Sequence, residues 1–277
     1  MDPKESRRAS LADIRRCIAA TSCSRARKQL AVSLAADPRR GARRLAERML
    51  VAESTRKRER ARISKLFARR NRLLRGGLQF VAGVDEVGVG PLAGPLVAAA
   101  VVFPVRVDLD ALEGLNDSKK LKPVVRERLA AEIRRQAIGV SIGSVSVPDV
   151  DRLNVYHAAH EAMRRAVLGL GVVPEHVFVD ARTIPRIDFP QTAIVGGDAL
   201  EASIAAASIV AKVHRDAWMR RLDEHHPGYG FDRHMGYGTR HHLAALSRLG
   251  PSPVHRRSFA PVRASMDRAA VDGQRAE

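Results

Sequence analysis

The stretch LQFVAGVDEVGVGPLAGPLVAAAVVF, residues 78–103, decides the fold of this chain. Its first part, 78–85, is a short apolar run that leads into the acidic pair Asp85-Glu86 and predicts a β-strand. Its last part, 96–103, is continuously apolar and contains β-branched valines, which predicts a buried strand. Glycines and prolines between the two runs predict a turn. The stretch therefore predicts two neighbouring strands, with two carboxylates where the first strand meets the turn.

Downstream of this stretch, predicted strands alternate with predicted helices. Apolar residues at every second position predict a strand over 138–147, and a short apolar run predicts another over 176–180. The expected helices cover 126–136, 148 to about 169, 199–225 and 241–249. Ser118 is the expected cap ahead of the first helix, and Pro148 opens the second. Neighbouring strands followed by strands that alternate with helices predict an α/β fold with a mixed sheet.

The charge of the chain is concentrated at its N-terminus. The 277 residues carry 48 Lys and Arg against 30 Asp and Glu, a net charge of +18, and residues 1–75 hold 23 of these cations against 7 acids. Because this segment is rich in good helix formers, we expect a basic helical N-terminal extension over 1–75, broken near Asp37-Pro38 and Gly41. Such an extension is either a solvated helical face or an arm that binds phosphates without sequence preference.

Composition excludes several classes of protein. Two cysteines, Cys17 and Cys23, are too few for a disulfide framework or a zinc site of their own. The longest uncharged run, 87–105, has enough residues for a membrane span, but glycines and prolines interrupt it. We therefore expect a monomeric, cytoplasmic protein without membrane association, whose positive charge makes nucleic acids its natural partners. We expect residues 76–262 to form the catalytic domain and 263–277 to form a disordered tail.

Four acidic residues lie where strands and helices begin or end. Asp85 and Glu86 precede the turn Gly88-Val89-Gly90, and the other two are Asp180, which ends the strand 176–180, and Asp198, which follows Gly196-Gly197 at the start of an alanine-rich helix. Functional sites are built at such positions. A simpler explanation exists for two of them, since Asp198 could cap a helix and Asp180 could stabilise a turn.

If these carboxylates converge, they repel one another unless cations neutralise them. Ligation by oxygen alone, without histidine or cysteine, favours a hard ion such as Mg²⁺ or Mn²⁺. Two such ions, about 3.5–4 Å apart, could activate a water molecule and stabilise the leaving oxygen of a phosphodiester. The four acids therefore predict a site for metal-assisted hydrolysis.

Five sequence blocks occur in a fixed order. They are 82–95, 115–121, 179–181, 197–199 with the helix 205–212, and 236–239 with 255–259. With these blocks the chain, over about residues 78–262, resembles ribonuclease HII, the bacterial type 2 ribonuclease H. The segment 37–41 is also similar to a helical extension that some members carry ahead of the catalytic domain.

The resemblance implies an RNase H-like mixed sheet flanked by helices, and an endonuclease that cuts the RNA strand of RNA/DNA hybrids. It also implies incision at single ribonucleotides in duplex DNA, with 3′-hydroxyl and 5′-phosphate ends. By the same resemblance, Asp85, Glu86, Asp180 and Asp198 are the catalytic, metal-binding carboxylates.

The resemblance also implies a set of substrate-binding residues. The turn Gly88-Val89-Gly90 falls where the family grips the ribose 2′-hydroxyl, Tyr237 matches the tyrosine that reads the RNA-to-DNA junction, and Lys119 lies in the segment expected near backbone phosphates. The 2′-hydroxyl is the only group that separates a lone ribonucleotide from DNA, so a ribonucleotide-specific enzyme must recognise it.

Three positions depart from the family pattern, and each lacks a cation. Val89 stands where arginine is usual, and Gly196 and Leu200 stand where lysine is frequent. Because cations that contact phosphate are a main source of affinity, we expect weaker substrate binding. One alternative is a non-catalytic protein that binds hybrids or duplexes and derives from such an enzyme. Another is a metal hydrolase of small substrates, which the basic extension and Tyr237 disfavour.

The remaining cationic side chains near the C-terminus have simpler interpretations. The histidines expected on helix surfaces, rather than at a metal, are His214, His225, His226, His241 and His242, because no carboxylate–histidine spacing accompanies them. For His255-Arg256-Arg257, contact with phosphate and a solvated basic turn are both open.

Overall fold

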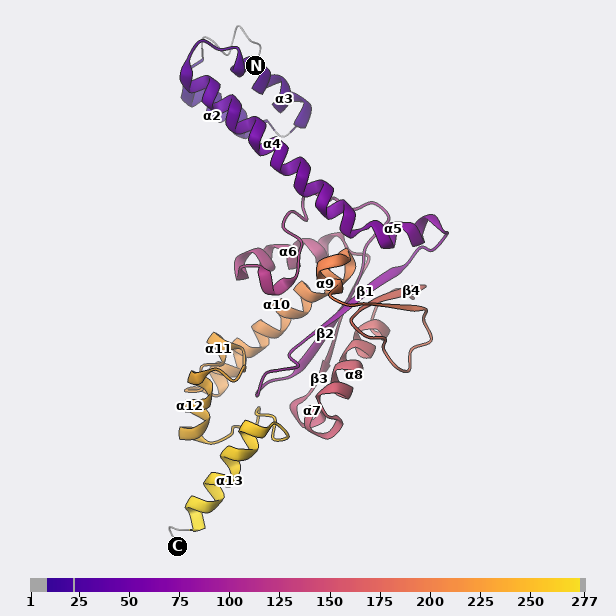
Figure 1. The fold of residues 1–277 in the computed structure, drawn as a ribbon, viewed down its shortest axis with the longest axis vertical. Helices are drawn as coiled ribbons and strands as arrows, with labels where there is room; N and C mark the ends of the chain where they lie inside the picture. Colours follow the sequence, from indigo (N-terminus) through magenta and orange to yellow (C-terminus); the bar gives the residue numbers. More distant parts are fainter. Residues whose placement is uncertain (1–8, 22, 275–277) are drawn as a thin grey trace. The chain divides into compact units, whose positions relative to one another are not determined.

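The computed structural model of the chain describes residues 9–21 and 23–274 (Figure 1). The chain divides into two compact units between Arg62 and Ile63. This division precedes the boundary at 75/76 that composition predicted. It does so because Ile63, Leu66 and Phe67 are buried in the hydrophobic core of the second unit, although they belong to the basic segment.

The first unit is helical, as expected from its composition. It contains α2 (Leu11–Ala20), α3 (Ser24–Ala35) and most of α4 (Arg40–Leu66). A small core holds these helices together, with Ile14, Leu30, Leu34, Ala42 and Ala46 buried in it. Ser10 begins α2 with a capping box, in which its side chain accepts a hydrogen bond from Asp13 N and the Asp13 carboxylate accepts one from Ser10 N.

The second unit is built around a mixed five-stranded sheet, as predicted. The strands are β1 (Val81–Val87), β2 (Leu96–Val102), β3 (Gly139–Val145), β4 (His176–Asp180) and β5 (Gln191–Ile194). Their order is β3-β2-β1-β4-β5. β2 pairs antiparallel with β1 and β3, whereas β4 pairs parallel with β1 and β5. Pattern reasoning did not predict β5, because it has four residues and Thr192 and Ala193 are exposed.

Helices cover both faces of the sheet (Figure 1). On one face, α6 (Pro123–Gln136) and α10 (Ala202–His225) lie over a core that includes Val97, Ala99 and Val101 of β2. On the same face, α5 (Ala68–Arg75) packs against a smaller cluster that contains Val81 of β1 and Ile204 of α10. On the other, α7 (Val147–Leu153) and α8 (Val155–Leu168) cover the alternate residues of β2. The alternation follows from the two-residue period of a strand.

Two glycines allow the main helices to approach the sheet closely. A Cβ at Gly83 of β1 would lie 2.2 Å from the carbonyl carbon of Ser203 in α10. A Cβ at Gly143 of β3 would lie 2.0 Å from the carbonyl oxygen of Ala162 in α8. Both distances are far below van der Waals contact, so a side chain at either position would push its helix away from the sheet.

Two predicted helices are interrupted. The segment 148–169 breaks into α7 and α8 at Asn154, which has a φ of 61° and whose side chain accepts hydrogen bonds from Tyr156 N and His157 N. The segment 199–225 divides into α9 (Gly197–Leu200) and α10 at Glu201. Ser118 does not cap a long helix, since it begins the short 3₁₀ helix η1 (Ser118–Lys120), and α6 starts later.

The C-terminal segment differs from the expected disordered tail. After α11 (Phe231–His234) and α12 (Arg240–Leu249), helix α13 covers Ala260–Gln274, while 275–277 lie outside the described residues. Val262 is buried against Leu92 and Leu246, and the Ser265 hydroxyl donates to Leu246 O, so the start of α13 packs on α12. Among the described residues, no helix is both long and apolar enough to span a lipid bilayer.

Candidate active site

The parallel pairing of β1 and β4 brings two of the predicted carboxylates together. Val84 of β1 is in register with Val179 of β4, so the next residues, Asp85 and Asp180, lie beside each other at the same end of the sheet. Asp85 is buried and faces α10, because it shares a face of β1 with Gly83. Glu86 projects from the opposite face of the strand, toward α8.

Asp198 reaches this site from the short helix α9. Gly196, with a φ of 66°, turns the chain into α9, and Gly197 N donates a 2.7 Å hydrogen bond to Asp180 Oδ1. This bond orients the Asp180 carboxylate and holds α9 beside β4. The buried Asp198 side chain is hydrogen-bonded to Asp117, which belongs to the second sequence block, 115–121, and which sequence reasoning did not name as a site residue.

The carboxylates raise one another's pKa. Burial, and then the charge of Glu86, raise the pKa of Asp85 well above its usual range, against a hydrogen bond from Ser208 that lowers it. The pKa of Glu86 is raised by burial and by Asp180. The pKa of Asp198 is raised by burial, Asp117 and Asp180. A buried group of mutually repelling acids is a site that a cation would stabilise.

Lys119 lies in the field of these acids. Its segment is fixed by Asp117, whose carboxylate accepts from Lys119 N at 2.9 Å. Partial burial disfavours the charged ammonium, yet the charges of Asp198, Asp85, Asp117 and Asp180 together raise the pKa of Lys119. Lys119 is exposed, so its ammonium is accessible from solvent.

The glycine turn lies beside the carboxylates and beside Tyr237. Val89 lines a cavity of about 220 Å³ together with Glu86 and Asp180. A Cβ at Gly90 would lie 3.6 Å from Cε1 of Tyr237, and Leu92 N donates a 2.8 Å hydrogen bond to Gly236 O. The structure thus joins the two segments for which the resemblance implied ribose and junction recognition.

Two buried arginines hold this turn, and sequence reasoning assigned neither of them to it. Arg256 donates to Gly88 O at 2.7 Å, to Val89 O at 3.1 Å and to Gly94 O at 2.9 Å. It is fully buried, so its side chain does not contact phosphate, the interpretation that the sequence had left open. Burial, and then the charge of Arg215, lower the pKa of Arg256 to about 9, and it stays charged at neutral pH.

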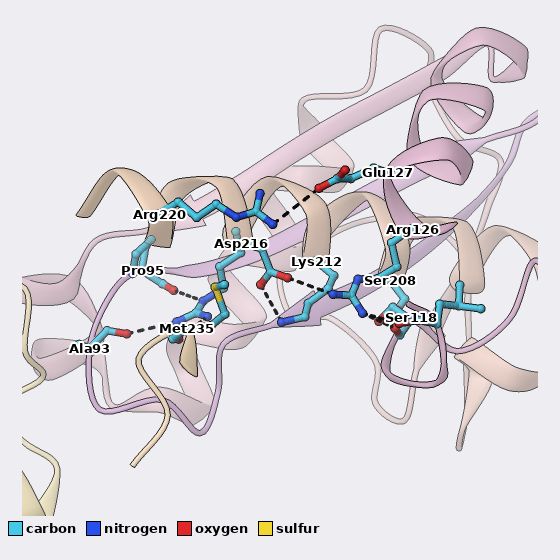
Figure 2. A network of polar contacts seen from close by, with 12 residues as sticks. Ala93, Pro95, Ser118, Arg126, Glu127, Ser208, Lys212, Asp216, Arg220 and Met235 are labelled. Atoms are coloured by element: carbon cyan, nitrogen blue, oxygen red, sulfur yellow. Dashed lines mark hydrogen bonds and ion pairs between the residues drawn. The ribbon is translucent and has the colours of Figure 1, made fainter. Parts of the chain in front are cut away.

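Arg215 of α10 performs the same task at the other end of the turn. Its guanidinium donates to Pro95 O at 2.9 Å, Ala93 O at 3.1 Å and Met235 O at 3.0 Å (Figure 2). The last contact reaches the segment that carries Tyr237. Because the bonds to Pro95 and Ala93 join residues 120 and 122 positions apart, only the folded structure reveals them.

Helix α10 also fixes the Lys119 segment. The Ser208 hydroxyl lies 2.8 Å from that of Ser118, and Asp216 accepts from Lys212 at 2.6 Å and from Arg126 at 3.4 Å (Figure 2). Arg126 in turn donates to the carbonyls of residues 118 and 121. The contacts place η1 against the face of α10 that carries the hydrogen bond to Asp85.

One histidine prediction is wrong. His242 is fully buried, not on the helix surface, and its Nε2 lies 3.0 Å from His255 Nε2. Its Nδ1 lies 2.9 Å from Tyr237 O, so this pair packs under the Tyr237 segment. Burial, and then His242, lower the pKa of His255 to about 4. The pair is therefore a neutral structural contact near physiological pH.

The donor chemistry of the site fits a hard divalent ion. Asp85, Glu86, Asp180 and Asp198 offer carboxylate oxygens, which Mg²⁺ and Mn²⁺ prefer. Within the described ranges, no three Asp, Glu, His or Cys side chains lie close enough to form a ready-made metal site. The carboxylates therefore share one electrostatic field but would have to turn toward an ion to bind it.

Comparison with known proteins decides the family. The ribonuclease HII family model matches residues 82–262, which include all but the first residue of β1, the glycine turn, all four carboxylates and both buried arginines. The chain belongs to the ribonuclease HII family. Ribonuclease HII of Myxococcus xanthus is 50% identical over 235 residues, covering 84% of this chain and 79% of the relative. Ribonuclease HII of Geobacillus thermodenitrificans is 48% identical over 231 residues, covering 83% of this chain and 87% of the relative.

Solved structures agree with this ribonuclease HII assignment. Ribonuclease H2 from Pyrococcus horikoshii superposes with a TM-score of 0.57 and 27% identity, over 68% of this chain and 98% of that one. RNase HII of Archaeoglobus fulgidus, solved in complex with PCNA, superposes with a TM-score of 0.54 and 31% identity, over 64% of this chain and 92% of that one. The RNase H-like fold is thus confirmed, and this member of the ribonuclease HII family is an enzyme that acts on the RNA of RNA/DNA hybrids. The alternative of a non-catalytic binding protein is disfavoured accordingly.

Proposed function

We propose that hydrolysis by this enzyme depends on divalent metal ions held by Asp85, Glu86, Asp180 and Asp198. The observation that carries the proposal is the buried cluster of acids, in which three of the four carboxylates have raised pKa values. Repulsion among buried carboxylates costs stability, and a cation bound between them would offset that cost. When bound, Mg²⁺ or Mn²⁺ ions supply an activated water and stabilise the leaving oxygen.

The protein's own groups then orient the reactants. Gly197 N–H donates to Asp180 and Ser208 O–H donates to Asp85, so these contacts limit how far the two carboxylates move when they turn toward an ion. Lys119 is in place to contact a phosphate next to the carboxylates. Together these contacts support a position for the scissile phosphate beside the carboxylates.

We further propose that the enzyme incises at single ribonucleotides in duplex DNA and leaves 3′-hydroxyl and 5′-phosphate ends. The glycine turn supports this proposal, because Arg256 occupies the carbonyls of Gly88 and Val89. The N–H groups of the turn then remain as donors to a ribose 2′-hydroxyl, and they do not require the arginine that Val89 replaces. Tyr237 is exposed beside Gly90, and this position supports a contact with the next sugar.

A duplex with one ribonucleotide tests both proposals. We expect cleavage with Mg²⁺ or Mn²⁺, none with chelator, and a product that DNA polymerase can extend, which reports a 3′-hydroxyl. Asp180→Asn should lower kcat by at least about a thousandfold, as for other groups of a hydrolytic centre, while circular dichroism stays unchanged. Cleavage that persists in chelator, or in folded Asp180→Asn, would contradict the metal proposal. The monomeric state and the cytoplasmic location stay predictions.

A further inference from the structure

A second cavity lies next to the active site, on the α8 side of the sheet. It measures about 500 Å³. We call it the arginine pocket, and the side chains that define it are Arg152, Arg164, Arg165, Arg186, His157 and His160. Glu161 is the acidic residue of its lining. Four guanidinium groups against one carboxylate give this cavity a strong preference for anions.

The arginine pocket adjoins the cavity at the carboxylates, and one side chain lines both. His160 lines both this pocket and the 220 Å³ cavity that contains Glu86 and Asp180. Its side chain is 92% buried in the fold, with 8% relative exposure, and its Nδ1 is buried with no hydrogen-bond partner among the described residues. A buried ring nitrogen without a hydrogen-bond partner costs folding free energy. A bound ligand, or a water molecule that enters with the ligand, would supply the partner.

An aromatic and a cationic group lie next to His160 in the cavity at the carboxylates. The exposed Tyr156 ring packs edge-on against His160 with centroids 4.5 Å apart, and the Arg182 guanidinium lies 5.1 Å from the Tyr156 centroid. Both residues line the cavity at the carboxylates. An aromatic face beside a basic groove is the arrangement that binds a nucleic-acid strand, with sugars or bases on the ring and phosphates on the cations.

The arginines retain donors for a ligand despite their local ion pairs. Arg164 and Arg165 share Glu161, at 2.9 and 2.7 Å, and Arg152 pairs with Asp149. Each guanidinium has five N–H donors, so one carboxylate between two arginines leaves several of them for phosphate oxygens. Arg186 lies exposed on the loop before β5, with a φ of 59°.

We propose that the arginine pocket binds backbone phosphates of the hybrid or duplex on one side of the cleavage site. The inference rests on the proposed position of the scissile phosphate at the four carboxylates. The strand leaves that position along Tyr156 and Arg182 and passes His160, and its next phosphates then enter the pocket. The chemistry it recognises is a phosphate group, whose source is either this strand or a free phosphate ion.

The test compares two double variants. Arg164→Gln with Arg186→Gln removes two cations from the pocket, and Arg134→Gln with Arg135→Gln is the matched control on α6, which covers the other face of the sheet. The match is close, since Arg135 pairs with Glu132 at i,i+3 as Arg164 pairs with Glu161. Binding of a 24-base-pair RNA/DNA hybrid is measured by fluorescence anisotropy in chelator, over a series of salt concentrations.

We expect the pocket variant to raise Kd roughly tenfold and to flatten the slope of log Kd against log salt by up to about two, since each phosphate contact contributes about 0.9. The control should change Kd less than twofold. Hybrids shortened from one end should lose the effect of the pocket variant, whereas hybrids shortened from the other should keep it. That asymmetry places the pocket on one side of the cut.

Equal Kd values and slopes for the two double variants would overturn the proposal. A free-phosphate site would give a different result, in which inorganic phosphate raises the melting temperature of the wild type but not of the pocket variant, and hybrid affinity stays the same. Circular dichroism of both variants verifies folding. Neither result depends on cleavage, so failure of the pocket proposal leaves the Asp180→Asn test of the metal centre unaffected.

Discussion

Replacing Arg256 by lysine should loosen the glycine turn while it keeps the buried charge. The guanidinium bonds to three carbonyls, those of Gly88, Val89 and Gly94, and it bonds to the last of these through two nitrogens. A lysine ammonium is a compact group and cannot span three acceptors as the planar guanidinium does. We therefore expect two buried carbonyls to lose their donor in Arg256→Lys.

Structure gives the size of this effect. A buried acceptor without a partner costs about 1–3 kcal/mol, so two should lower the free energy of unfolding by about 4 kcal/mol. For a folded unit of roughly 200 residues this corresponds to a melting temperature lower by about 10 °C. Urea unfolding followed by circular dichroism measures the change, and Arg257→Lys at the neighbouring exposed position is the control.

Catalysis provides a second measurement of the same contact. If Arg256 positions the turn, Arg256→Lys should lower kcat/KM on a duplex with one ribonucleotide by roughly a hundredfold, as a misplacement of about 1 Å can. A hybrid with a continuous RNA strand should lose less, because many ribonucleotides can be bound in turn. A variant with wild-type unfolding free energy and the wild-type ratio between the two substrates would refute the positioning role.

Two further predictions concern a buried acid and the substituted turn residue. Burial raises the pKa of Glu201 from 4.5 to about 7, so the folded protein binds a proton between these values and its stability falls as pH rises through 7. Glu201→Gln keeps an acceptor oxygen for Ser203 N and Ile204 N. Its free energy of unfolding should exceed that of the wild type by about 3 kcal/mol at pH 8 and by little at pH 4.5. Identical pH profiles of the two proteins in urea unfolding would contradict this. Val89→Arg adds a cation at the exposed centre of the turn and should lower Kd for the hybrid about tenfold at low salt, whereas weaker binding would show that the cavity is shaped around valine.

The parts of the site that sequence predicted are those with a local signal. Apolar runs in the sequence predicted β1, β2 and β4. The acidic residues Asp85, Glu86 and Asp180 were predicted because they end the runs of β1 and β4. Two strand ends at one edge of a sheet are close in space only if the strands are parallel neighbours, which the register of Val84 with Val179 establishes. Local pattern thus found the acids, and topology brought them together.

What sequence missed depends on contacts between distant segments. Arg256 and the turn it holds are 162 to 168 positions apart, and His242 gives no local sign that His255 will cover it. Both lie in stretches rich in cations, where exposure is the ordinary expectation. The break at Glu201 was missed for a different reason, since alanine-rich sequence favours an unbroken helix and the capping carboxylate there is buried.

One face of α10 links chemistry to substrate recognition. Ser208 holds Asp85 and the Lys119 segment, while Arg215 holds the glycine turn and the segment before Tyr237. These residues are seven apart, so they lie on the same side of the helix, about 10 Å from each other along its axis. Because Gly83 lets α10 lie directly on β1, the helix cannot shift without disturbing both contacts. The distance between the carboxylates and the glycine turn is therefore set by a rigid helix and not by the loop that carries the turn.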